Sequence, residues 1–110
     1  MKLLQDSILL LSNIKYRGKS NPTQKDRRPA IIISNKVFNQ HLGLAFACPI
    51  TNTKRDFPFH IEIQSDNITG FIMTEQMKSI DYYSRKIKFI EKADQKTLNK
   101  ILGIIDSIIQ

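Results

Sequence analysis

The sequence predicts a mainly β protein, a small and strongly bent antiparallel sheet or barrel covered at one end by a C-terminal helix. Five or six short apolar segments rich in branched residues are separated by clusters of turn-forming residues. The segment "FHIEI" alternates apolar and polar residues, as a half-buried strand does. From Asp94 the apolar residues instead follow the 3, 4, 7 spacing of an amphipathic helix. With 110 residues, we expect one domain over positions 1–110.

The first half of the chain predicts three strands. "SILLLSNI" at 7–14 fits the first strand, and "PAIIIS" at 29–34 fits the second. Proline is tolerated at the first residue of a strand, so this strand should begin at Pro29 and bury its three isoleucines. "NKVFNQHLG" predicts a short helical turn or loop. "LGLAFACPIT" predicts another buried strand, in which Pro49 indicates an edge, a bulge or the strand's end.

The second half predicts a hairpin, a last strand and the helix. In "FHIEI", Phe59 and the two isoleucines should share the core face, which places His60 on the outer face. "QSDNITG" predicts the turn of a hairpin leading into "FIMTEQMKSI". "KIKFIE" alternates again and fits the last strand. Asp94 suits the N-cap of the terminal helix.

Charge favours a polyanionic partner. Seventeen Lys and Arg against ten Asp and Glu give a net charge of +7. Six basic residues lie between positions 15 and 28, opposed by Asp26 alone. Because that window is rich in Gly, Ser, Asn and Pro, we expect a basic loop there rather than one face of a helix.

Several classes of protein are disfavoured. His41, His60 and a single cysteine do not form a metal-ligand pattern, and the scattered glycines do not form a phosphate loop. We therefore expect no metal and no cofactor, two ordinary surface histidines and a buried, unreactive Cys48. No apolar stretch approaches the ~20 residues of a membrane helix. A cytoplasmic protein without membrane contact is expected.

Two polar stretches, "TQKDRRP" at 23–29 and "PITNTKR" at 49–55, concentrate the remaining chemistry. Each joins basic groups to hydroxyls or amides at a strand boundary, where a rigid backbone can orient side chains. Arginine binds phosphate oxygens through two N–H groups at once. Two such loops side by side could clamp a phosphodiester, for cleavage or for passive nucleic-acid binding.

A resemblance to a known family narrows these options. "RRPAIIIS", "FN", "CPIT", "FPFHIEI" and "GFIMTEQMKSIDYYSRKIKFIEK", in this order and closed by the helix, resemble the MazF/PemK toxin endoribonucleases from about residue 6 to the end. The resemblance implies an SH3-like barrel of the kind shared by CcdB and MazF, a homodimer and an acidic antitoxin partner. It also implies metal-independent, sequence-specific cleavage of single-stranded RNA, in which the 2′-hydroxyl attacks to leave a 2′,3′-cyclic phosphate and a 5′-hydroxyl.

The same resemblance implies roles for individual residues. Arg28, before the motif proline, and Thr51, in "PIT", match the catalytic positions; Arg28 would stabilise charge, with proton transfer as a second role. Thr23 stands where the family usually has glutamate. Glu75 matches the acidic residue of the family's "DQ" element, although a carboxylate paired with a loop arginine is an equal alternative. The RNA-binding candidates are Thr23, Gln24, Arg27, Asn52, Lys54, Arg55, Phe57, Glu75 and Gln76.

Two other functions remain open on sequence alone. Gyrase-poisoning toxins resembling CcdB share the barrel, bind a protein target and cut nothing, but a pure binder would not need the "RRP" and "PIT" pair. A catalytically degenerate family member that binds RNA or antitoxin without turnover is the other alternative, and Thr23 in place of glutamate is the feature that supports it.

Overall fold

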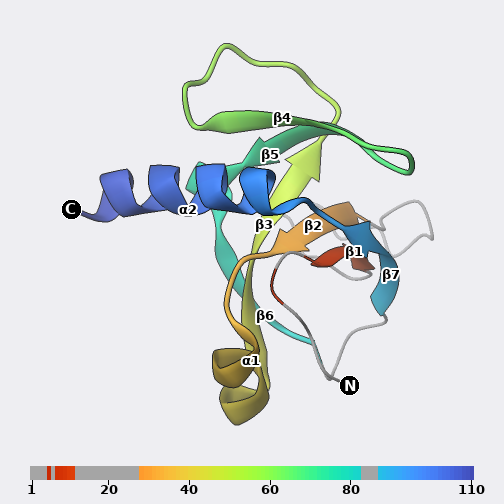
Figure 1. Ribbon diagram of the computed structural model, residues 1–110, viewed down its shortest axis with the longest axis vertical. Helices are drawn as coiled ribbons and strands as arrows, with labels where there is room; N and C mark the ends of the chain where they lie inside the picture. Colours follow the sequence, from red (N-terminus) through yellow and green to blue (C-terminus); the bar gives the residue numbers. More distant parts are fainter. Residues whose placement is uncertain (1–4, 6, 12–27, 83–86) are drawn as a thin grey trace, which may run out of the picture.

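A computed structural model of the protein describes residue 5 and residues 7–11, 28–82 and 87–110 (Figure 1). In this part of the chain, strands and helices follow one another in the order that the sequence predicts, except that one predicted strand is divided in two. The elements are β1 (Ser7–Leu11), β2 (Arg28–Ile32), α1 (Lys36–Leu42), β3 (Leu44–Thr51), β4 (His60–Gln64), β5 (Thr69–Met73), a 3-10 turn (Thr74–Gln76), β6 (Lys78–Asp81), β7 (Ile87–Lys92) and α2 (Gln95–Ile109).

The described strands form one antiparallel sheet in the order β4-β5-β3-β2-β1-β7, with β6 also paired to β3. The long strand β3 contacts β2 along one side, and β6 and then β5 along the other. Pro49 lies between the β6 ladder, which ends at Ala47, and the β5 ladder, which begins at Ile50. Its missing N–H therefore falls where β3 changes partner, which explains a proline inside a central strand.

The mainly β class with a C-terminal helix is confirmed, but the sheet is not a closed barrel. In the described ladders, β4 and β7 are the two end strands. A side-chain contact joins them: Ser65 Oγ, just after β4, donates to Glu91 Oε1 of β7 at 2.6 Å. The Asn67 N–H donates to the same oxygen at 3.2 Å. Glu91 thus fastens the β4–β5 hairpin to the opposite end of the sheet.

Both faces of the sheet bury apolar side chains. Helix α2 lies across one face (Figure 1), where Leu98 and Ile101 pack with Ile31, Ile33 and other residues of the larger core. Ile32 points to the opposite face, into a second core with Leu9, Ala30, Ala45, Ala47, Ile80 and Tyr82. All three isoleucines after Pro29 are therefore buried, as the sequence predicts.

Short-range signals account for the two helices. Helix α1 begins after Asn35, whose side chain accepts from Phe38 N, and ends at Gly43, whose φ of 66° suits glycine. Helix α2 begins after Asp94, whose carboxylate accepts from Thr97 N at 2.7 Å. Hydrogen bonds from Thr97 to this carboxylate lower the pKa of Asp94. The predicted N-cap is confirmed.

Two expectations about local structure were wrong. "FIMTEQMKSI" is not one strand, because the 3-10 turn at Thr74–Gln76 separates β5 from β6. Phe59 precedes β4 and is 36% exposed, so it does not share the core face with Ile61 and Ile63. The hairpin turn, the last strand and the terminal helix are as predicted.

Candidate functional site

Strand register brings Arg28 and Thr51 together. On β2 and β3, Ala30 is paired with Pro49. Continuing this antiparallel register by two residues on each strand places Arg28 opposite Thr51. Directly opposed residues of an antiparallel pair share one face of the sheet, with Cβ atoms about 4.5–5.5 Å apart. Two residues far apart in sequence are therefore neighbours, as the phosphate-clamp hypothesis requires.

An open cleft of about 270 Å³ lies at this end of the two strands. Arg28 and Thr51 both line it, together with the backbone neighbours of each, the first residue of β5 and the residue before it. Arg28 is the only charged side chain among the described residues that line it. The lining residues are Arg28, Pro29, Ile50, Thr51, Asn52, Ile68 and Thr69.

The Thr51 hydroxyl is oriented by the loop that follows it. Thr51 Oγ1 accepts a hydrogen bond from the Thr53 N–H at 3.2 Å. Because a hydroxyl has one proton to donate and two lone pairs, this contact leaves the Thr51 proton available. Among the described residues, no acceptor within the protein takes that proton. Thr51 can therefore donate toward an anion in the cleft.

The face that carries Thr51 continues across two more strands. Thr51 is paired with Phe71 on β5, and Phe71 is paired with Glu62 on β4. Beside this row, Gly70 makes room for the Thr51 backbone, since a Cβ at Gly70 would lie 2.6 Å from the Thr51 carbonyl oxygen. The sequence reasoning missed Phe71 and Gly70, because their importance comes from the register of β3 with β5.

The loop between β3 and β4 arches over this end of the molecule (Figure 1). Its residues Asn52, Lys54 and Arg55 are exposed, as binding side chains should be. Phe57 is 51% exposed, and its ring meets the His60 ring edge-on at 5.3 Å between centroids. The loop thus presents two cations and an aromatic ring to solvent.

Glu75 and Gln76 lie in the 3-10 turn and are exposed. Glu75 Oε2 lies 3.0 Å from His60 Nε2, so its partner among the described residues is a histidine. The His60 side chain is only 3% exposed, so the expectation of an ordinary surface histidine was wrong for this residue. His41 is exposed, as predicted. Alternation placed His60 on the outer face, but it could not show that the turn and Phe57 cover it.

Cys48 is buried and inert. Its side chain lies in the larger core, and burial, with a smaller contribution from the negative charge of Glu75, raises its pKa to about 12. A thiol in this state has almost no thiolate at neutral pH. The expected structural role of Cys48 is consistent with these surroundings.

Three RNA-binding candidates, Thr23, Gln24 and Arg27, lie outside the described residues. Within the part that the structure describes, no three His, Cys, Asp or Glu side chains are grouped as a metal site would require. In the same part, no helix is both long and apolar enough to cross a membrane.

Comparisons with known proteins agree with this fold. A family model described as "PemK-like, MazF-like toxin of type II toxin-antitoxin system" matches residues 9–109. The chain belongs to this family. It is 27% identical over 62 residues to the endoribonuclease toxin MazF of Escherichia coli K12, a match that covers 56% of each protein. It is 28% identical over 91 residues to the endoribonuclease PemK of Escherichia coli, covering 78% of this chain and 68% of PemK.

Solved structures support the fold. The chain superposes on MazF in a MazE-MazF crystal structure from Deinococcus radiodurans with a TM-score of 0.83 at 22% identity, covering 99% of this chain and 96% of that one. A mycobacterial endoribonuclease in complex with its cognate antitoxin gives a TM-score of 0.77 at 18% identity, covering 97% and 94%. At these identities the likeness establishes the architecture alone.

Proposed function

We propose that the protein is the toxin of a type II toxin-antitoxin system and a metal-independent, sequence-specific endoribonuclease acting on single-stranded RNA. The observation that carries this proposal is the convergence of Arg28 and Thr51 on one cleft. Its support also comes from the family match over residues 9–109 and from relatives named as endoribonucleases.

In the proposed reaction, the ribose 2′-hydroxyl attacks the adjacent phosphorus and the 5′-oxygen leaves. The nucleophile is tethered to the phosphorus, which gives it a high effective concentration without a metal. The 2′-hydroxyl gives up its proton as a new O–P bond closes the 2′,3′-cyclic phosphate, the P–O5′ bond breaks, and the departing oxygen takes up a proton to become a 5′-hydroxyl. The protein must stabilise the negative charge that gathers on the phosphorane oxygens.

Arg28 and Thr51 divide this task. A guanidinium stays protonated in proteins and can bind two phosphate oxygens at once, so Arg28 neutralises the developing charge. The Thr51 hydroxyl, held by the Thr53 N–H, donates its proton as a hydrogen bond to one of the same oxygens. Both donors are on strand ends of the sheet, where the backbone fixes their positions before RNA binds.

The exposed loop would hold the flanking RNA. Lys54 and Arg55 would contact phosphates, Asn52 would bind beside the scissile group, and Phe57 would stack on an unpaired base. Gln24, Arg27 and Thr23 are proposed to extend the same surface. The net charge of +7 suits both RNA and an acidic antitoxin. A homodimer working in the cytoplasm completes the proposal.

The test is cleavage of a long mixed-sequence RNA in EDTA, with the cut termini mapped. We expect cuts at one short sequence motif and none when the scissile nucleotide carries a 2′-deoxy sugar. An Arg28→Ala variant should fold normally and lose most activity. Cutting of the deoxy substrate would exclude the proposed nucleophile, and an uncut RNA would favour a toxin that only binds.

A further inference from the structure

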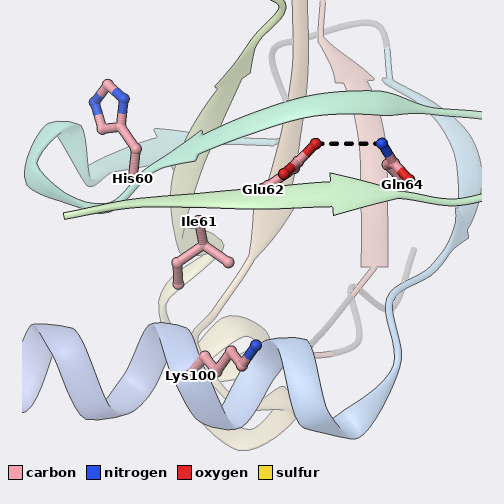
Figure 2. A pocket seen from close by; sticks show the side chains of 5 residues that line it. All are labelled: His60, Ile61, Glu62, Gln64 and Lys100. Atoms are coloured by element: carbon pink, nitrogen blue, oxygen red, sulfur yellow. Dashed lines mark hydrogen bonds between the residues drawn. The ribbon is translucent and has the colours of Figure 1, made fainter. Parts of the chain in front are cut away.

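His60 is a buried titratable side chain that the proposed chemistry does not use. Figure 2 shows its ring pointing away from α2, while Ile61 points toward the helix. Its Nε2 faces Glu75 Oε2 at 3.0 Å, and its Nδ1 is buried with no hydrogen-bond partner among the described residues. Since an ionised carboxylate only accepts hydrogen bonds, Nε2 carries the proton and donates it. This contact fixes both the tautomer of His60 and the direction of Glu75.

The surrounding contacts make this corner rigid. Thr74, beside Glu75, donates both its hydroxyl and its N–H to the Phe59 carbonyl oxygen. The His60 N–H donates to the carbonyl of Phe57, whose ring covers the imidazole edge-on. The 3-10 turn and the end of the β3–β4 loop are therefore tied together around His60. A side chain held in this way can discriminate between ligands, because its position is set before binding.

Glu75 keeps one oxygen free for a ligand. Oε2 accepts from His60, whereas Oε1 has no partner among the described residues and the residue is exposed. That atom can accept a hydrogen bond but cannot donate one, and its charge repels phosphate. Among the donors that RNA offers, an exocyclic amino group of a base fits this atom, as in the known contact of Glu and Asp with cytosine N4.

The strand register gives the distance between His60 and Thr51, which lies at the proposed cleavage site. His60 is paired with Met73, two residues along β4 from the row that contains Thr51, Phe71 and Glu62. Two strand spacings and two residues along a strand separate His60 from Thr51 by about 12 Å, using the usual spacings of a sheet. Glu75 therefore lies beside a nucleotide that flanks the scissile one.

We propose that His60 is a positioning residue that holds Glu75 as a specificity-determining acceptor for the amino group of one base flanking the cut site. This inference rests on the proposed RNA cleavage and names the chemistry that part of the recognition sequence must have. Uracil, which lacks an exocyclic amino group, would be disfavoured at that position. Removal of the amino group should cost about 10- to 100-fold in kcat/KM, as expected for one hydrogen bond to a charged group.

The experiment compares RNA oligonucleotides that differ by one amino group. At each position flanking the mapped cut, cytidine is replaced by pyrimidin-2-one riboside, guanosine by inosine and adenosine by purine riboside. Cleavage rates give the discrimination at each position. Non-cleavable copies with a 2′-deoxy sugar at the scissile nucleotide give the same comparison by binding affinity.

Four variants assign the discrimination to the pair. Glu75→Gln should abolish it, since an amide both donates and accepts, and His60→Phe should abolish it by removing the donor that orients Glu75. His60→Gln should retain it, because its amide can still donate. Asp106→Asn, an exposed carboxylate on α2, changes the net charge as Glu75→Gln does and should leave discrimination intact.

The outcomes separate this inference from the proposed function. A preference of about 10-fold or more that survives in His60→Gln and disappears in the other two pair variants supports it. The inference is overturned if wild type, Glu75→Gln and His60→Phe all discriminate equally. It is also overturned if His60→Gln loses as much discrimination as His60→Phe. If His60→Phe fails to fold, the comparison of Glu75→Gln with His60→Gln decides: the inference requires that discrimination is lost in the first and kept in the second. A wild type that binds selectively without cutting supports the inference and overturns the nuclease proposal; one that binds no RNA overturns the inference.

Discussion

Replacing Gly70 by alanine should impair the proposed active site without touching RNA. The added Cβ would lie 2.6 Å from the Thr51 carbonyl oxygen and 3.0 Å from Ile50 Cγ2. Because the first contact is with backbone, β3 and β5 must move apart by at least about 0.4 Å to reach a tolerated separation of 3.0 Å. The shift falls on Thr51 itself. We expect a loss of about 1–3 kcal/mol in stability, the usual cost of overpacking.

Activity should fall as well, because a displacement near 1 Å can cost about 100-fold in rate. A shift of roughly half that size should cost about 10-fold in kcat, measured by single-turnover cleavage at 25 °C beside a urea unfolding curve. Gly103→Ala is the matched control: its Cβ would meet nothing within 4 Å, and alanine in a helix should add about 0.5–1 kcal/mol of stability. If Gly70→Ala proved as stable and as active as wild type, the close packing of β5 on Thr51 would be refuted.

Three further predictions follow from the structure. Thr51→Val keeps the shape of the side chain but removes both the proton donor and the acceptor of the exposed Thr53 N–H, so kcat should fall about 100- to 1,000-fold while stability falls by no more than about 1 kcal/mol; a kcat loss smaller than about 10-fold would remove the hydroxyl from catalysis. Glu91→Ala deletes the acceptor shared by Ser65 and Asn67, so urea unfolding should show a loss of about 1–2 kcal/mol in stability. Glu91→Gln should lose less, because it keeps an acceptor. Equal stability of wild type and both variants would contradict the contact between the two ends of the sheet. Cys48, with a pKa raised to about 12, should resist alkylation at pH 8 until the protein is unfolded, and rapid labelling of the native protein would contradict its burial.

Patterns within short segments predicted much of the fold. The three isoleucines after Pro29, the alternation of Ile61 and Ile63 and the N-cap at Asp94 were all readable, because each depends on neighbours within a few residues. The split of "FIMTEQMKSI" was not readable. It depends on β3 exchanging β6 for β5 as its partner, which is a contact between distant segments.

In the candidate site, too, local motifs were readable from the sequence and contacts between distant segments were not. Arg28 and Thr51 could be nominated from their motifs, and the register then placed them opposite one another. The contact of Glu75 with His60 was not predicted, since the position of His60 against the 3-10 turn follows from tertiary packing. Gly70 was overlooked because a strand glycine reveals its purpose only when the neighbouring backbone is known.

The chemical identity of the new RNA ends tests the central claim most directly. Mass spectrometry of the fragments from a short single-stranded RNA, cut in EDTA by the wild-type protein, reads both termini at once. The convergence of Arg28 and Thr51 on one phosphate predicts a 2′,3′-cyclic phosphate on the upstream fragment and a free 5′-hydroxyl on the downstream one. A 5′-phosphate on the downstream fragment would mean that water attacked and the 3′-oxygen left, and it would contradict the account.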